Sequence, residues 1–176
     1  LPNVCTGMIA RTFRNPGQQF IDGSVEFVMA GDNLRLTDVQ GAIGVAQMAR
    51  LPGLVEARSH FASRYDEMLA PLRFMPQHRG SGAAVQSYVV LAPAEMRASE
   101  VISELRTRGI EATVGTNAIP FTRYYSSHYG IAEVDLPHTV AVSQRAVTLP
   151  LFPQMTEAVQ DTVVQALAEI VQVVVR

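Results

Sequence analysis

The sequence predicts a layered α/β domain. Between residues 74 and 175, short apolar runs suited to buried strands alternate with longer segments whose apolar residues recur at helical spacing. The chain has 176 residues, of which 48% are hydrophobic and 17% are charged, so it can supply the core of one domain of ordinary size. Strands separated by helices favour an arrangement in which helices pack on a sheet.

Residues 1–30 lack a clear periodicity and are punctuated by proline and glycine. We expect one strand over residues 4–10. A second extended segment is expected over residues 20–29, with a turn at Asp22 and Gly23.

A well-marked helix is predicted to begin at Thr37 and to end at Arg50. Thr37 can accept a backbone N–H bond at the N-cap, and Gln40 can return the bond as a capping box. Asp38 adds a negative charge in the first turn, which suits the helix dipole. Residues 39–49 carry no charge, so we expect the helix to be buried on most sides, either in the core of a monomer or at a subunit interface.

Residues 51–53, Leu-Pro-Gly, are predicted to end this helix, and a second helix is expected over residues 54–72. Its apolar stripe consists of Val55, Phe61 or Ala62, Tyr65, Leu69 and Leu72. Arg58 falls within the stripe. We expect its aliphatic stem to pack against the core and its guanidinium to reach water or a carboxylate.

The remaining elements alternate between strand and helix. A buried strand is expected over residues 87–92, and Ser99 is expected to cap a helix that runs to about Arg108 and ends at Gly109. The later expected elements are a strand over residues 110–114, a helix from Leu136 or Pro137 to Ala146, a strand over residues 147–149, a turn over residues 150–153 and a helix from Thr156.

Composition and charge exclude several classes of binding partner. With a net charge of −2 and a pI near 6.1, the chain has no electrostatic footprint for nucleic acid. No basic run indicates a membrane surface, and no apolar run is long enough to span a bilayer. The single cysteine, Cys5, excludes an internal disulfide and fits a reducing cytoplasm. The four histidines show no paired ligand spacing, so no metal site is expected.

Residues 31–44, GDNLRLTDVQGAIG, carry a resemblance to a known family. The segment is similar to the GYNYRMTDIQAAIG region of the DegT/DnrJ/EryC1/StrS family. Members of that family are pyridoxal-phosphate (PLP) enzymes, mostly aminotransferases acting on nucleotide-linked keto sugars. Asp32 and Leu34 stand where the family usually has aromatic residues.

Two further segments resemble the family. Residues 148–153, TLPLFP, are similar to its SLPLFP segment, and residues 11–17, RTFRNPG, are similar to its RxxRNHG segment with Pro16 in place of histidine. The alternative interpretation of residues 11–17 is that Arg11 and Arg14 form a solvated arginine pair. The resemblance implies the small C-terminal domain of a fold-type I PLP enzyme over residues 31–176, preceded by a remnant of the large PLP-binding domain over residues 1–30.

The resemblance also implies a homodimer. In the family, an asparagine or lysine at the position of Asn33 reaches across the dimer to the PLP phosphate held by the other subunit, and the helix that follows packs at the interface. Arg35 adds a charge suited to phosphate. We therefore predict Asn33 and Arg35 as cofactor-binding residues and the helix from Thr37 to Arg50 as the interface. The alternative is that Asn33 and Arg35 only cap the turn before the helix.

Residues 115–130, GTNAIPFTRYYSSHYG, are the candidate substrate loop. A loop of this length inside a compact domain is uncommon and often functional. It resembles the family's GTYxxPxxxxYY loop, which implies Thr116, Asn117 and Tyr124 as contacts to the nucleotide-sugar substrate. Tyr88 matches a family tyrosine at the start of a strand and is a fourth candidate. The alternative is a loop packed down by its own aromatic side chains.

The fourteen basic residues are all arginine, so the chain contains no lysine. A PLP aminotransferase holds its cofactor as a Schiff base on a lysine. We therefore expect no catalytic residue in this chain, and we expect an enzyme whose lysine lies upstream, with glutamate as the family's usual amino donor. The start at Leu1 agrees with a fragment, a processed product or an incompletely determined protein.

Two other functions stay open at this point. One is a free-standing binding or dimerisation module derived from the small domain. The other is a dehydratase of the same family, in which histidine replaces the lysine.

Overall fold

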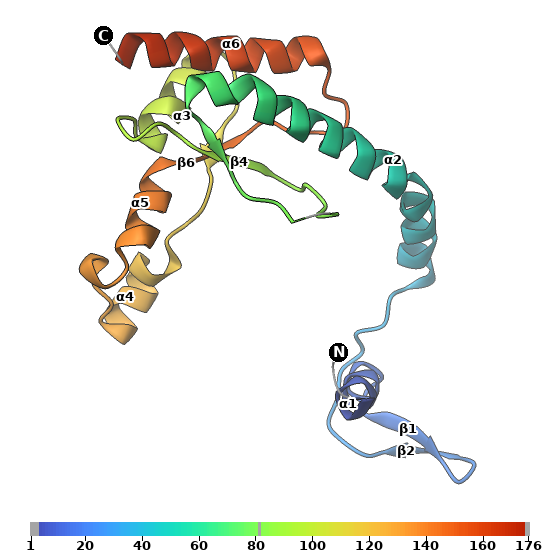
Figure 1. Cartoon of the computed structure of the whole chain (residues 1–176). Coiled ribbons are helices and arrows are strands. Elements are labelled where there is room, and N and C mark those ends of the chain that lie inside the picture. Colours follow the sequence, from blue (N-terminus) through green and yellow to red (C-terminus); the bar gives the residue numbers. More distant parts are fainter. Residues whose placement is uncertain (1–3, 81, 175–176) are drawn as a thin grey trace. The chain divides into compact units, whose positions relative to one another are not determined.

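The computed structural model describes residues 4–80 and 82–174, and the chain divides into two compact units (Figure 1). The first unit comprises Leu1–Leu51 and the second Pro52–Arg176. Each unit has a sheet of its own, two-stranded in the first and four-stranded in the second.

Helix α1, Val4–Arg14, opens the first unit, so the expected strand over residues 4–10 is wrong. Met8 and Thr12 lie one helical turn apart, and the Thr12 hydroxyl donates to the Met8 carbonyl at 3.0 Å. Thr12 is buried and also accepts a bond from the amide of Gln19 at 2.8 Å. The bond from Gln19 links α1 to the next strand, whereas the bond to Met8 stays within the helix.

Strands β1, Gln18–Ile21, and β2, Ser24–Phe27, form an antiparallel hairpin. The predicted turn at Asp22 and Gly23 is confirmed. Both residues have positive φ, 47° and 85°, as a two-residue type I′ turn requires.

Helix α2, Asp38–Leu69, is continuous through Pro52, so the predicted break at residues 51–53 is wrong. The capping box at its start is confirmed. The Thr37 N–H donates to the Gln40 side chain at 2.9 Å, and the Gln40 N–H donates to the Thr37 hydroxyl at 3.3 Å. A proline removes one hydrogen bond of the ladder, and helix on both sides of it preserves the rest. A short 3-10 helix, Ala70–Leu72, follows.

The sheet of the second unit is wholly antiparallel, in the order β3-β4-β6-β5. Its strands are β3, Met75–Pro76; β4, Tyr88–Leu91; β5, Thr113–Val114; and β6, Ala146–Leu149. The central pair aligns Tyr88 with Leu149, and β5 aligns Thr113 with Thr148 and Val114 with Val147 of β6.

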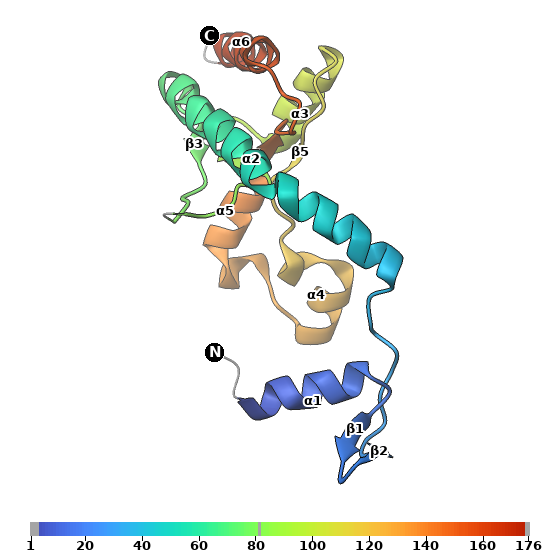
Figure 2. The ribbon, with the colours of Figure 1, turned by 90° about the vertical axis from the view of Figure 1, so that its right-hand side faces the viewer.

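Helices cover the sheet, so the predicted α/β layering is confirmed (Figure 1, Figure 2). The remaining elements are α3, Ala98–Thr107; 3-10 helices Ile119–Phe121 and Glu133–Asp135; α4, Arg123–Tyr129; α5, Pro137–Arg145; and α6, Glu157–Val174. The predicted cap at Ser99 is wrong. Ser99 lies inside α3, whose first turn is closed by a bond from the Arg97 N–H to the Glu100 carboxylate at 3.1 Å.

The second half of α2 supplies one wall of the core. Phe61, Ala62, Tyr65 and Leu69 are buried, which confirms the predicted stripe from that point onward. The prediction did not name the partners that Arg58 has: one nitrogen of its guanidinium donates to backbone carbonyls of Gln86 (2.6 Å) and, more weakly, Val85 and Leu151. The helix is thereby tied to the start of β4 and to the turn after β6.

Candidate functional site

A pocket of about 450 Å³ lies in the first unit. Arginine and amide side chains from α1, from β1 and from the segment before α2 surround it, and we call it the arginine pocket. Its lining residues are Met8, Arg11, Thr12, Arg14, Asn15, Gln18, Gln19, Phe20 and Arg35. Residues far apart in the sequence therefore contribute to one site.

Close contact between two glycines brings these segments together. A Cβ added to Gly31 would meet the Gly17 backbone nitrogen and would lie 2.5 Å from the Phe13 carbonyl oxygen, so only glycine fits without a shift. Next to this contact, the Asp32 N–H donates to the Phe13 carbonyl at 2.8 Å, and the Leu34 N–H donates to the Arg14 carbonyl at 3.0 Å. The segment that carries Arg35 is thus held against the end of α1.

Three guanidinium groups give the arginine pocket its charge. Arg11, Arg14 and Arg35 line it, no lining residue is acidic, and no ion pair joins any of the three within residues 4–80 and 82–174. Like charges held together without a counterion favour the binding of an anion. Guanidinium groups present paired N–H donors that match the oxygens of a phosphate or carboxylate.

Asn33 and Arg35 are joined by a hydrogen bond. The Arg35 Nε donates to the Asn33 side-chain oxygen at 2.9 Å, and the Asn33 N–H donates to Asp32 Oδ1 at 2.8 Å. The Asn33 oxygen is thus occupied, which orients its amide nitrogen as a donor. Arg35 lines the arginine pocket, whereas Asn33 is not among the lining residues.

Tyr88 lies in the core of the second unit. Its side chain is fully buried, its ring stacks on Tyr65 with centroids 4.8 Å apart, and its hydroxyl donates to Asp66 at 2.7 Å. Burial raises the pKa of Tyr88, and the hydrogen bond to Asp66 raises it further. Arg79 also pairs with Asp66 and lies over the Tyr88 ring. This position does not support a contact between Tyr88 and a substrate, so we leave Tyr88 out of the site proposed below.

The candidate substrate loop is partly helical. It contains the 3-10 helix Ile119–Phe121 and helix α4, where an irregular loop was expected. Thr116, Asn117 and Tyr124 are exposed, with Tyr124 66% exposed. Tyr124 stacks on His128 at 5.7 Å between ring centroids, one turn along α4. The substrate role of these three residues stays a prediction.

Two other features, a metal-binding cluster and a membrane-spanning helix, are absent from residues 4–80 and 82–174. No group of three or more histidine, cysteine, aspartate or glutamate side chains that could hold a metal ion occurs there. Likewise, none of the helices in this part of the chain combines the length and the apolar character needed to cross a membrane.

Comparison with models of protein families identifies the family of this chain. The model of the DegT/DnrJ/EryC1/StrS aminotransferase family matches residues 6–168. The chain belongs to this family. The predicted family resemblance is therefore confirmed, and it extends through the arginine pocket as well as the second unit.

Solved structures of sugar aminotransferases share the fold. The PMP form of a Streptococcus pneumoniae protein named as a sugar aminotransferase superposes with a TM-score of 0.85 at 20% identity, covering 99% of this chain and 47% of that one. PseC of Helicobacter pylori, an aminotransferase involved in the biosynthesis of pseudoaminic acid, gives 0.84 at 20%, covering 97% and 47%. DesV of S. venezuelae, in complex with a ketimine intermediate, gives 0.80 at 22%, covering 94% and 44%.

The chain of this DegT/DnrJ/EryC1/StrS family member spans about half the length of these structures. The S. pneumoniae protein is known in PLP and PMP forms. The arginine pocket fits the phosphate of such a cofactor, since Arg11, Arg14 and Arg35 offer donors and no lining side chain is acidic. The chain has no lysine that could hold the cofactor's aldehyde carbon.

The sequence did not predict that Arg11 and Arg14 line a pocket with Arg35; a solvated pair was the alternative interpretation. Two features of the sequence could have indicated the pocket. The arginines are three residues apart, which places them on one face of a helix, and Gly17 and Gly31 flank the two segments that meet.

Proposed function

We propose that this chain is the C-terminal part of a PLP-dependent aminotransferase that transfers an amino group to a nucleotide-linked keto sugar. Membership of the family and the shared fold with sugar aminotransferases support the proposal. When bound, PLP supplies the electron sink for the amino transfer. The lysine for this cofactor would lie in a part of the protein outside this chain, and glutamate would be the amino donor.

The arginine pocket is the observation that carries the proposal. Arg35, oriented by its bond to Asn33, would donate to an oxygen of the cofactor phosphate held by a partner subunit. Asn33 would donate its amide N–H to the same phosphate. These contacts bind and orient the cofactor, and they need no proton transfer.

The partner subunit would be a second copy of the protein. The first half of α2 exposes apolar side chains on more than one side of the helix, and nothing in the described chain covers them: Val39 is 71% exposed, Ile43 58%, Val45 74% and Met48 64%. A helix with no charged residue between Val39 and Ala49 is costly to leave in water, and exposed apolar patches of this kind mark interfaces. We therefore infer a homodimer through the helix from Thr37 to Arg50.

The candidate substrate loop would contact the nucleotide sugar. Thr116 and Asn117 offer hydrogen-bonding groups and Tyr124 offers an exposed ring. Aromatic rings stack on nucleobases, and each such contact typically contributes about 1–3 kcal/mol. Their exposure supports this role.

The test compares PLP with pyridoxal, which lacks the phosphate, on the full-length protein. We expect Arg35→Gln to weaken PLP binding about ten-fold or more, the effect of losing a charged hydrogen bond, with little effect on pyridoxal. Arg106→Gln, which removes an exposed arginine on α3 outside both the arginine pocket and the proposed interface, is the matched control. Equal losses for PLP and pyridoxal, or no loss, would contradict a phosphate contact at Arg35.

A second measurement concerns the 176-residue chain alone. Without lysine it should give no covalent adduct with PLP at an internal side chain after borohydride reduction, and it should not transaminate. An adduct located by mass spectrometry at an internal residue would contradict this expectation.

A further inference from the structure

The arginine pocket holds more positive charge than one phosphate needs. Residues 1–51 contain four arginines and four carboxylates, so the side-chain charges of this part of the chain balance. Three of these arginines line the pocket, and none of the carboxylates is among the lining residues that the structure describes. A phosphate monoester carries a charge of about −1.5 to −2 at neutral pH. At least one guanidinium group is therefore left for another anion.

The carboxylates of the first unit are placed where they do not cancel this charge. Asp32 is the nearest to Arg35 in the sequence, and its Oδ1 accepts the Asn33 N–H at 2.8 Å. Glu26, on the hairpin, accepts the Ser24 hydroxyl at 3.1 Å. The other two lie in the hairpin turn and in the first turn of α2: Asp22 and Asp38.

The end of α1 does not oppose an anion either. Carbonyl groups without partners give a helix C-terminus a partial negative charge. Here the Thr12 carbonyl accepts two backbone N–H bonds, at 2.9 and 3.1 Å. The Phe13 carbonyl accepts the Asp32 N–H at 2.8 Å, and the Arg14 carbonyl accepts the Leu34 N–H at 3.0 Å. Backbone donors thus occupy these carbonyls, and the guanidinium groups determine the charge of the pocket.

The three arginines come from two separate segments. Arg11 and Arg14 are three residues apart in α1, so they lie on one face of the helix, and both are exposed. Arg35 precedes α2, and its Nε is already bonded to Asn33 at 2.9 Å. The pocket volume, about 450 Å³, lies in the range of sites that hold whole small molecules. The pocket therefore has room for a second anionic group on its α1 side.

We propose that Arg11 and Arg14 bind the diphosphate of the nucleotide-linked substrate, while Arg35 contacts the cofactor phosphate. This inference rests on the proposed aminotransferase function. A diphosphate that joins a nucleoside to a sugar carries one negative charge on each phosphate, so two guanidinium groups balance it. Each guanidinium also offers paired N–H donors that match two phosphate oxygens.

Amide side chains complete the α1 side of the pocket. Asn15 and Gln18 line it and are half-buried, so their amides can donate to phosphate oxygens that the arginines leave free. The Gln19 amide nitrogen is instead bonded to the Thr12 hydroxyl at 2.8 Å. The donors for a diphosphate are therefore the two guanidinium groups and two amides.

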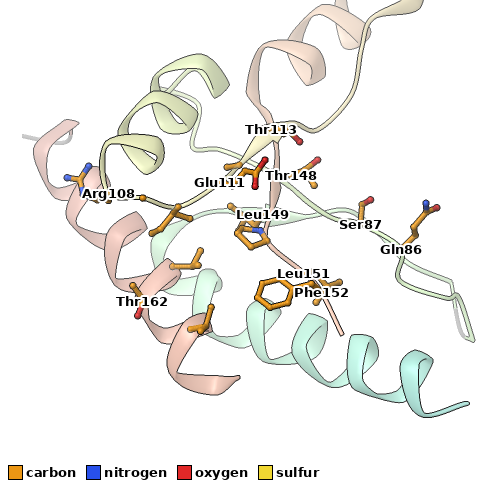
Figure 3. Close-up of a pocket in the computed structure, with 16 residues that line it drawn as sticks. Gln86, Ser87, Arg108, Glu111, Thr113, Thr148, Leu149, Leu151, Phe152 and Thr162 are labelled. Carbon is orange, nitrogen blue, oxygen red and sulfur yellow. The ribbon is translucent and has the colours of Figure 1, made fainter. Parts of the chain in front are cut away.

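A pocket in the second unit gives a contrast (Figure 3). It has a volume of about 540 Å³, and Arg108 lines it together with Glu111. The Arg108 guanidinium is paired with Glu104 at 2.7 Å and with Glu169 at 3.7 Å. Arg11, Arg14 and Arg35 have no ion pair within residues 4–80 and 82–174. Of these two pockets, the arginine pocket is the one suited to a diphosphate.

Three probes test the proposal on the whole chain by calorimetry at low salt: pyrophosphate, inorganic phosphate and glutarate. We expect pyrophosphate to bind about two- to five-fold more tightly than phosphate, the factor of one additional exposed ion pair, and glutarate to bind most weakly. Equal binding of pyrophosphate and phosphate overturns the proposal. Glutarate bound as tightly as pyrophosphate also overturns it, because the subsite would then suit the carboxylates of the amino donor.

Single variants locate the diphosphate. Arg11→Gln and Arg14→Gln should each remove the preference for pyrophosphate over phosphate. Arg106→Gln makes the same change of charge at an exposed position on α3 outside the pocket and should leave the preference intact. A preference that survives both variants in α1, or that Arg106→Gln removes equally, would show a general response to charge and would overturn the assignment.

A comparison of PLP with pyridoxal on the full-length protein separates this subsite from the cofactor site. Arg14→Gln should keep the preference for PLP that Arg35→Gln loses. If Arg14→Gln loses it too, Arg14 belongs to the cofactor phosphate, and the diphosphate subsite is overturned while the proposed function stands. If neither variant affects PLP binding but pyrophosphate binding still depends on Arg14, the cofactor contact at Arg35 fails and the diphosphate subsite stands.

Discussion

Gly31 lies against the backbone of Gly17 and Phe13, so closely that a Cβ on Gly31 would sit 2.5 Å from the Phe13 carbonyl oxygen. This contact joins the end of α1 to the segment that carries Asn33 and Arg35. Two hydrogen bonds from Asp32 and Leu34 to the end of α1 reinforce it. The arginine pocket therefore depends on a backbone contact, and a change of one atom at Gly31 should disturb it.

Gly31→Ala should destabilise the first unit and open the arginine pocket. Adding a methyl group against backbone that cannot move freely costs roughly 1–3 kcal/mol. We expect weaker binding of inorganic phosphate to the chain, measured by calorimetry at low salt, where charge interactions are least screened. Phosphate affinity equal to that of the unaltered chain would contradict this account.

Gly41→Ala is the matched control for Gly31→Ala. Gly41 lies in α2 with no atom within 4 Å of an added Cβ. The substitution should raise stability by up to about 1 kcal/mol through helix propensity and leave phosphate binding unchanged. If Gly31→Ala lowers the stability and Gly41→Ala raises it, the effect at Gly31 comes from its close backbone contact and not from replacing a glycine in general.

Pro52→Ala should stabilise helix α2. Proline inside a helix costs about 3 kcal/mol relative to alanine, and Pro52 is exposed in the middle of a continuous helix. We expect a gain of about 1–3 kcal/mol in the free energy of unfolding, measured by urea titration with circular dichroism. Pro120→Ala, near the start of a 3-10 helix where proline is tolerated, should give no such gain. A loss of stability in Pro52→Ala would mean that the helix depends on the proline.

Local sequence signals predicted caps and turns correctly where one or two side chains decide the structure. The capping box of Thr37 and Gln40 and the turn at Asp22 and Gly23 are such cases, because bonds or φ angles within four residues fix them. The break at Pro52 was predicted by the same kind of rule and is wrong. Helical turns on both sides of Pro52 outweighed one lost hydrogen bond.

The sequence did not predict which segments that lie far apart along the chain contact one another. The arginine pocket needs Arg35 to meet Arg11 and Arg14, and only the packing of Gly31 on the end of α1 brings them together. Arg58 was expected to meet water or a carboxylate. Its guanidinium donates to the backbone carbonyls of Gln86 and Leu151, which lie 28 and 93 residues further along the chain, so local periodicity does not encode these contacts.

Two buried tyrosines should make the second unit sensitive to alkali. Burial raises the pKa of Tyr65 above its ordinary value of 10.0, and burial with a hydrogen bond to Asp66 raises that of Tyr88. Below pH 10 both states keep the phenolic protons and stability is fully present. Above it the unfolded state loses protons that the folded state retains, so the free energy of unfolding falls as pH rises.

The free energy of unfolding should fall by up to about 1.4 kcal/mol per pH unit for each tyrosine. Guanidinium unfolding at pH 9, 10 and 11 measures it. Tyr88→Phe should lower stability at pH 9 by about 1 kcal/mol through the lost hydrogen bond and should flatten the alkaline slope. Tyr124→Phe alters an exposed ring and should change neither. A slope unchanged in Tyr88→Phe would contradict the role of that proton.

Val45→Asp should dissociate the proposed homodimer. Val45 is 74% exposed on an uncharged half of α2, and placing a carboxylate in an apolar interface leaves a charge without a partner there. Sedimentation of the full-length protein should show a dimer that becomes monomeric in the variant. Val173→Asp is the matched control, since Val173 is 73% exposed on α6 outside the proposed interface. A monomeric unaltered protein, or dissociation by Val173→Asp but not by Val45→Asp, would contradict an interface on α2. PLP affinity adds a second reading, because a phosphate held by Arg35 of a partner subunit should be bound more weakly once the subunits separate.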